Sequence, residues 1–183
     1  EQFAESPISN QHENFKVQTF IYLYTAKVNQ HFMHGTFKEG LSIVPYIESK
    51  LEEYALYFDN HRVLVFNYKI ATLYFGSGDY AICIDYLHRI INDNVDLRYD
   101  IQCYARLLHL LAHYEMENFD IMDSLIKSVY RYMTKMETIT VIEEEIFKFL
   151  RASFKLTRRE LKPELEKLLQ KIKHLDDTET TNC

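Results

Sequence analysis

Two histidines one helical turn apart are the first residues of this sequence that could bind a metal ion. His109 and His113 stand at positions i and i+4 of an apolar stretch, so a helix would present both imidazoles on one face. The helical zinc-protease pattern requires Glu directly after the first His, and Leu110 stands there instead. The general base is therefore absent, and we interpret both rings as partly buried packing residues. His31 and His34, at i and i+3, form an equally weak pair, and only a meeting of both pairs in space would complete a site.

The other reactive side chains form no catalytic pattern. Glu143, Glu144 and Glu145 stand at the expected start of a helix, where carboxylates interact favourably with the positive end of the helix dipole. The segment GSGD at 76–79 lacks the Gly, Lys and Ser/Thr that must follow in a phosphate-binding loop. No nucleophile elbow occurs in the sequence. We therefore predict that the protein is not an enzyme and that it has no cofactor and no metal centre.

Composition favours one soluble helical domain. The chain has 183 residues, which suffice for a substantial core, and 47% of them are hydrophobic. Only 4 Gly and 3 Pro are present, which favours long helices. The net charge of −6 disfavours nucleic acid as a partner. Residues 148–173 nevertheless include nine Lys or Arg and three acids, a charge of about +6 that we interpret as a solvated helix face. The alternative is a contact for an acidic partner or a phosphate backbone.

Cysteine usage and hydropathy indicate the compartment. Cys83, Cys103 and Cys183 are odd in number and have no ligand spacing, which argues against a complete internal disulfide framework. Cys83 and Cys103 lie among apolar residues and are typical of small core side chains in a reducing environment. No apolar run approaches the length of a membrane span, and no signal peptide is visible. We expect a cytoplasmic protein without membrane insertion, with the reservation that the sequence begins at Glu1 and not at Met.

Three similar turns divide the chain into helix pairs. His34-Gly35-Thr36-Phe37, Gly76-Ser77-Gly78-Asp79-Tyr80 and Met116-Glu117-Asn118-Phe119 each join polar or small residues to one aromatic ring. The rings of Phe37, Tyr80 and Phe119 are 43 and 39 residues apart, an interval that is typical of helical repeats. We predict a single domain over 1–183 with hairpins at 7–58, 61–92, 96–135 and 141–175. A polar tail at 176–183 should fray.

Local signals mark the helix ends. Ser6-Pro7 is a typical helix start, and Thr36–Glu39 and Thr140–Glu143 match the capping box. Gly35 should end the first helix, while Gly76 and Gly78 should form the tight turn before a helix capped by Asp79. Pro45 should kink the second helix or delay its regular start.

The segment 67–92, NYKIATLYFGSGDYAICIDYLHRIIN, carries the strongest family signal. Its turn is flanked by two small residues, Ala71 and Cys83, and by two aromatic residues, Tyr74 and Tyr80. This pattern resembles a tetratricopeptide repeat, although its intervals exceed the 34 residues of that family and Val95 stands where a closing Pro is usual. The resemblance implies a right-handed superhelix of about four antiparallel hairpins. It also implies that the first helices line a concave groove for a peptide or protein.

The resemblance places a set of mostly aromatic side chains on that groove. They are Tyr22, Asn29, Phe32, Tyr68, Thr72, Phe75, Tyr104 and Tyr114. Aromatic rings there would supply rigid contact area, and the alternative is that they pack inside wide helix interfaces. We therefore predict a non-catalytic scaffold that binds a protein or peptide. A sensor or regulatory domain of a larger protein, with a signalling peptide or small molecule as its ligand, is the alternative, and a catalytic bundle comes third. The sequence identifies neither the partner nor the oligomeric state.

Overall fold

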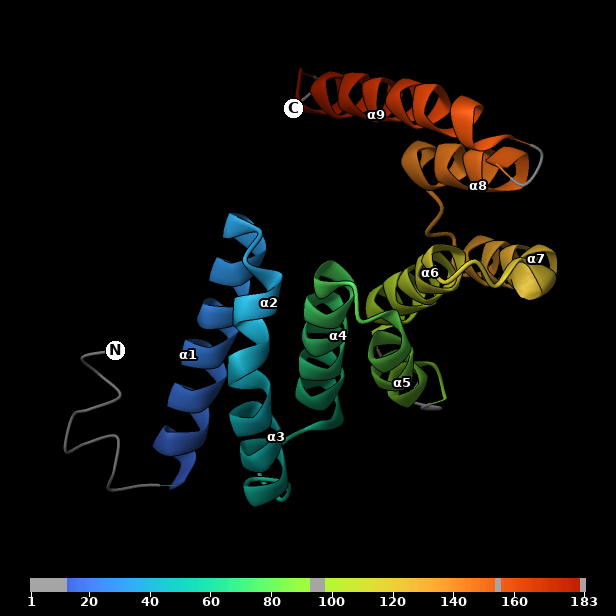
Figure 1. The fold of residues 1–183 in the computed structure, drawn as a ribbon. Coiled ribbons are helices and arrows are strands. Elements are labelled where there is room, and N and C mark those ends of the chain that lie inside the picture. Colours follow the sequence, from blue (N-terminus) through green and yellow to red (C-terminus); the bar gives the residue numbers. More distant parts are fainter. Residues whose placement is uncertain (1–12, 93–97, 154–155, 182–183) are drawn as a thin grey trace. The chain divides into compact units, whose positions relative to one another are not determined.

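Helices are the only regular secondary structure in the part of the chain that the computed structural model describes, which comprises residues 13–92, 98–153 and 156–181 (Figure 1). This confirms the all-α class. The Ser6-Pro7 helix start lies outside the described residues. The elements are α1 (Glu13–His34), α2 (Phe37–Gly40), a 3-10 turn (Leu41–Ile43), α3 (Val44–Glu53), α4 (Asn60–Ser77), α5 (Tyr80–Ile91), α6 (Tyr99–Glu115), α7 (Phe119–Lys135), α8 (Val141–Ser153) and α9 (Arg158–Thr181).

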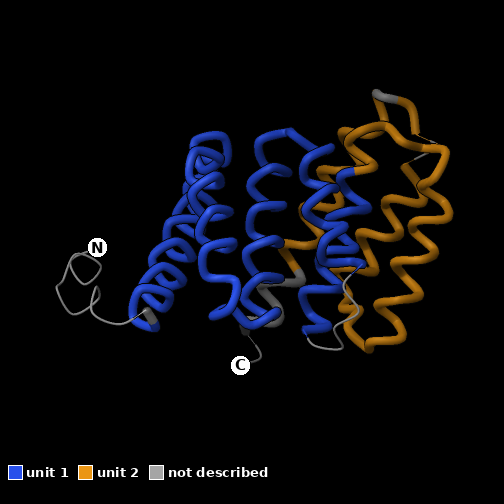
Figure 2. The backbone as a smooth tube through the Cα atoms, turned by 90° about the horizontal axis from the view of Figure 1, so that it is seen from below, with its two compact units in different colours: residues 1–112 blue, residues 113–183 orange. Residues whose placement is uncertain are grey.

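The chain divides into two compact units, residues 1–112 and 113–183 (Figure 2). The boundary falls inside the last turn of α6, so the predicted hairpin 96–135 is shared between the two units. Each unit is described by itself below. One continuous repeat array over 1–183 stays a prediction.

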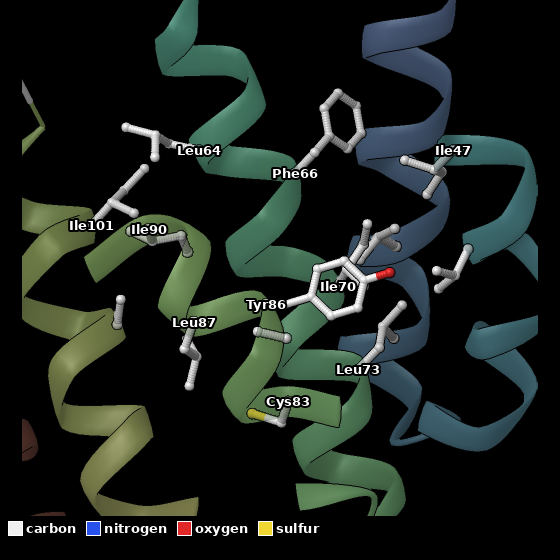
Figure 3. Packing of buried hydrophobic residues seen from close by; sticks show 14 of the residues in the cluster. Ile47, Leu64, Phe66, Ile70, Leu73, Cys83, Tyr86, Leu87, Ile90 and Ile101 are labelled. Carbon is white, nitrogen blue, oxygen red and sulfur yellow. The ribbon is translucent and has the colours of Figure 1, made fainter. Parts of the chain in front are cut away.

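The first unit contains α1 to α5 and most of α6. Helix α1 lies beside α2, α2 lies beside α4, and α4 packs extensively against α5 (Figure 1). On α5, Cys83, Leu87 and Ile90 are fully buried at intervals of four and three residues, so one stripe of the helix faces the core. Figure 3 shows these side chains together with Ile70 and Leu73 of α4 and with the Tyr86 ring of α5. Ala71 is also fully buried in this cluster.

A group of aromatic rings fills the space between α1, α3 and α4. Phe20 stands at its centre, with its ring centroid 5.0 Å from Tyr24, 6.2 Å from Tyr54 and 5.5 Å from Phe66. Tyr24 in turn stacks on Tyr46 at 4.9 Å. Because rings at these distances contribute packing beyond their buried area, a share of the Phe and Tyr excess has a structural role.

Two glycines end helices, and a third has a different role from the one expected. Gly35 and Gly78 have φ of 65° and 92°, the left-handed conformation that a helix end requires. Gly76, which we expected in the turn, lies inside α4. A Cβ at Gly76 would be only 2.3 Å from the ring of Phe37, so this glycine allows an aromatic side chain of α2 to rest on the α4 backbone.

The predicted capping boxes have different outcomes. Thr36 makes no side-chain cap, which makes that prediction wrong; its hydroxyl instead lies 2.8 Å from His31 Nδ1. At the start of α8 the Thr140 N–H donates to Glu143 Oε2 at 2.9 Å, as a capping box requires. Asp79 occupies the N-cap position of α5 but makes no cap hydrogen bond, because its carboxylate accepts from the Ser77 hydroxyl at 2.7 Å.

Pro45 was expected either to kink its helix or to delay the start of regular helix, and the structure shows the delay. Pro45 lies in the first turn of α3, and the separate turns of α2 and Leu41–Ile43 precede it. The regular helix is thus delayed rather than kinked, because proline fits the first turn, where its missing N–H has no partner to lose.

The second unit is built from α7, α8 and α9. Helix α7 buries Met122, Ile126, Val129 and Met133, a stripe of period 3.6. The ring of Tyr130 meets that of Phe147 on α8 edge-on at 5.4 Å. Helix α9 continues to Thr181.

Candidate binding surface

A lysine between α1 and α4 is the most informative polar side chain of the first unit. Lys69 Nζ donates to Asn29 Oδ1 at 2.5 Å and lies 5.6 Å from the ring centroid of Phe32. Its side chain is half-buried, and this burial lowers the pKa of its ammonium group. No carboxylate of the described residues lies within ion-pair distance of it. The ammonium therefore keeps hydrogen-bonding capacity that a carboxylate from outside could use.

Tyr68 and Thr72 lie beside Lys69 on the same helix. The Thr72 hydroxyl donates to the Tyr68 carbonyl at 2.8 Å, a back-bond that turns its oxygen toward the helix. Burial raises the pKa of the Tyr68 phenol, and the phenol of Tyr104 adds a smaller effect in the same direction. The two phenols, on α4 and α6, therefore interact electrostatically.

The predicted groove side chains differ in exposure. Tyr22 is 71% exposed and Tyr104 is 49% exposed, so both can contact a partner directly. Phe32, Tyr68 and Phe75 are partly buried and pack against the core. The rings of the set therefore differ in environment, and the groove stays a prediction.

Phe75 and Tyr114 stand apart from this group. The Phe75 ring meets Tyr80 at 5.4 Å, at the turn that joins α4 to α5. Tyr114 lies in the second unit, where its ring meets Phe119 at 6.1 Å. There it helps to line a cleft of about 400 Å³ together with Leu156 and Leu161.

An open cleft of about 270 Å³ lies between α1 and α4 in the first unit. Its lining residues are Ile21, Thr25, Asp59, His61, Arg62, Val65, Phe66 and Arg98. Arg62 is seven residues before Lys69, and therefore lies two turns away on the same face of α4. Its guanidinium lies 3.4 Å from Gln18 Oε1 on α1 and 3.4 Å from a carboxylate oxygen of Asp59.

The two cations of α4 thus follow one pattern. Each contacts an amide oxygen of α1, Arg62 at Gln18 and Lys69 at Asn29. Sequence reasoning included Asn29 in the site and missed both cations. The available signal was the spacing of Arg62 and Lys69, which lie seven residues apart on a helix that contains no other Lys or Arg and no Asp or Glu. Long charged side chains are rarely buried, so this spacing indicates an exposed face.

The histidines do not form the pairs that their spacing suggested. His109 Nε2 lies 3.1 Å from His88 Nε2 on α5, whereas His113 Nδ1 lies 3.0 Å from Asn118 Nδ2. His31 is directed at Thr36. Within the described residues, no group of three or more His, Cys, Asp or Glu side chains could hold a metal ion.

No described helix combines the length and the apolar character that crossing a membrane requires. No family model matches the sequence, and neither a curated protein nor a solved structure is significantly similar to the chain.

Proposed function

We propose that the protein is a non-catalytic scaffold whose α1, α4 and α6 surface binds a peptide or protein segment that carries carboxylates. The observation that carries this proposal is Lys69, a half-buried ammonium that is held by Asn29 and has no acidic partner among the described residues. A charged group in this position gains from a carboxylate ligand, because charge-assisted hydrogen bonds are strong where water is partly excluded.

The neighbouring side chains supply the other requirements of a binding surface. The exposed rings of Tyr22 and Tyr104 provide rigid contact area, and Arg62 provides a second cation on α4. A tetratricopeptide-like superhelix in a cytoplasmic protein is part of the same proposal, supported by the resemblance of residues 67–92 and by the burial of the Cys83 and Cys103 side chains.

The test is selection of phage-displayed 12-residue peptides on the intact chain, followed by calorimetry with the synthesised winners. We expect enrichment of Asp and Glu, and about a 10- to 100-fold weaker affinity for Lys69→Ala, which corresponds to the worth of a hydrogen bond to a charged group. Lys127→Ala, an exposed lysine of α7 that pairs with Asp123, is the matched control and should bind as the unchanged protein does.

A second variant separates binding from folding. Tyr104→Ala should weaken binding while the thermal melting temperature stays the same, because the ring is half exposed. Enrichment of peptides without acids, or full affinity in Lys69→Ala, would contradict the proposal.

A further inference from the structure

We propose that His88 and His109 form a two-histidine site for a divalent transition metal that prefers imidazole nitrogen, with Cu²⁺ as the ion that binds most tightly. The site lies between α5 and α6 in the first unit and is separate from the proposed peptide surface. It also differs from the His109–His113 pair that the sequence spacing suggests. The proposal concerns binding and assigns no catalysis to the ion.

The distance between the two nitrogens matches the spacing that one bound ion imposes. Imidazole nitrogens lie about 2.0–2.1 Å from zinc, so two of them at about 90–110° around one ion are about 2.9–3.4 Å apart. The Nε2 atoms of His88 and His109 are 3.1 Å apart.

The distance between the His88 and His109 ring centroids shows whether the two Nε2 atoms point at a common ion position or straight at each other. Two rings directed at a common ion with this nitrogen spacing would have centroids about 4.8 Å apart, whereas a collinear arrangement would place them about 5.4 Å apart. The observed separation is 5.0 Å, with the ring planes tilted by 45°. The arrangement is therefore close to that of two ligands that share one ion.

The two helices are held together next to this pair. Gln102 Nε2 of α6 donates to the Ile90 carbonyl at 2.6 Å, and Arg106 lies 3.4 Å from the Ile91 carbonyl. These contacts fix the end of α5 against α6, so little additional ordering is needed when an ion binds. His109 is only 9% exposed, whereas His88 is exposed and gives the ion a route from solvent.

A change of tautomer lets both ring nitrogens bind one ion. The nitrogen–nitrogen contact needs a proton on one Nε2 and a lone pair on the other. When an ion binds both lone pairs, the remaining Nε2 proton moves to Nδ1 of the same ring. Water completes the coordination, and Cu²⁺ should bind more tightly than Zn²⁺, as the general order of divalent affinities requires. Acidification should release the ion, because a protonated imidazole is not a ligand.

The test is calorimetric titration of the full chain with CuCl₂, combined with electron paramagnetic resonance of the copper complex. We expect one Cu²⁺ per chain, with hyperfine coupling to two nitrogens. His88→Ala should weaken binding at least about tenfold, since the loss of supporting contacts alone costs 10- to 100-fold. The spectrum of that variant should show one nitrogen fewer. Because His88 is exposed, the variant should fold normally, so the test does not depend on a change at buried His109.

His113→Ala is the matched control, since His113 lies one turn from His109 on the same helix and contacts Asn118 instead. It should bind copper as tightly as the unchanged protein. The proposal is overturned if the protein does not bind Cu²⁺, if His88→Ala keeps full affinity, or if His113→Ala loses as much affinity as His88→Ala.

Discussion

The α4–α5 and α8–α9 hairpins differ in the contacts between their helices. In the first, apolar side chains are fully buried, whereas in the second, charged side chains form hydrogen bonds from one helix to the other. Ile70, Leu73 and Leu87 are 0% exposed in the first. In the second, Glu145 of α8 accepts from Lys148 at 2.8 Å and from Lys171 of α9 at 2.6 Å. No described side chain of α9 is fully buried.

The composition of the helices explains this difference. Helix α5 has nine hydrophobic side chains among 12 residues, two of them tyrosines, while α9 has a charged or polar residue at most of its 24 positions. Burial of an apolar side chain contributes about 1.5–3 kcal/mol, and a surface ion pair contributes about 0–1 kcal/mol. We therefore expect α8–α9 to open at a lower cost in free energy than α4–α5. Exposed Leu165 and Leu169 on α9 are consistent with this order.

The largest effect should come from a cavity in the stronger hairpin. Leu87→Ala removes a fully buried side chain, so the free energy of unfolding in urea should fall by about 3 kcal/mol. Ile82→Ala on the same helix is the control, and should cost less than about 1 kcal/mol because Ile82 is 43% exposed. Equal losses for the two variants would show that α5 packs through another face.

The next effect concerns Gly76. Gly76→Ala would place a Cβ 2.3 Å from the Phe37 ring and should destabilise the protein by about 2 kcal/mol, which outweighs the better helix propensity of Ala. In a protein that already carries Phe37→Ala, the clash is absent. Gly76→Ala should then leave the free energy of unfolding unchanged or raise it. A double-mutant cycle from urea melts measures this coupling, and simple additivity would contradict the proposed contact.

A smaller effect is expected at the start of α8. Glu143→Ala removes the carboxylate that accepts from the Thr140 N–H, and should lower stability by about 1 kcal/mol. Glu144→Ala is the control, since Glu144 is an exposed neighbour with the same charge near the helix dipole. If both variants lose the same amount, the effect belongs to the dipole and not to the cap.

The smallest effect should be a pH dependence of the α8–α9 contact. Lys148, followed by Lys171, lowers the pKa of Glu145 through hydrogen bonds to the charged carboxylate. Its contribution is therefore fully present above the ordinary glutamate pKa of about 4.3 and is lost as the pH falls through the lower folded value. Melting temperatures of the unchanged protein and Glu145→Gln should differ slightly at pH 7 and converge near pH 3. A difference that persists at pH 3 would exclude an electrostatic cause.

Much of the helical structure could be predicted from the sequence because the spacing of apolar residues and the glycines and prolines at helix ends are local signals. The helical stripes, the ends at Gly35 and Gly78 and the delay at Pro45 all follow from backbone geometry and side-chain spacing. The role of Gly76 could not be predicted, because it depends on a ring 39 residues earlier in the chain. The failed cap at Thr36 has a similar cause, since the His31 side chain competes for its hydroxyl.

The candidate site was harder to predict than the fold. Tertiary contacts decide which rings are exposed, so Tyr22 and Tyr104 could not be separated from Phe32 and Tyr68 by spacing. The role of Lys69 depends on Asn29, a residue 40 positions away. The partner of His109 is a histidine on another helix, which a search for i, i+4 pairs cannot find.

The contact between the Phe37 ring and the Gly76 backbone has a consequence for synthesis of the chain on the ribosome. Helices α1 to α3 are made before the α4 backbone that receives this ring. At about 5–20 residues per second, the 39 residues between the two positions take about 2–8 s to translate. The Gly76 backbone leaves the ribosome later than Phe37 by this interval, and until then we expect the emerged Phe37 ring to be exposed to solvent and chaperones. Protease digestion of nascent chains stalled before and after α4 has emerged should show protection of α2 only in the longer chains.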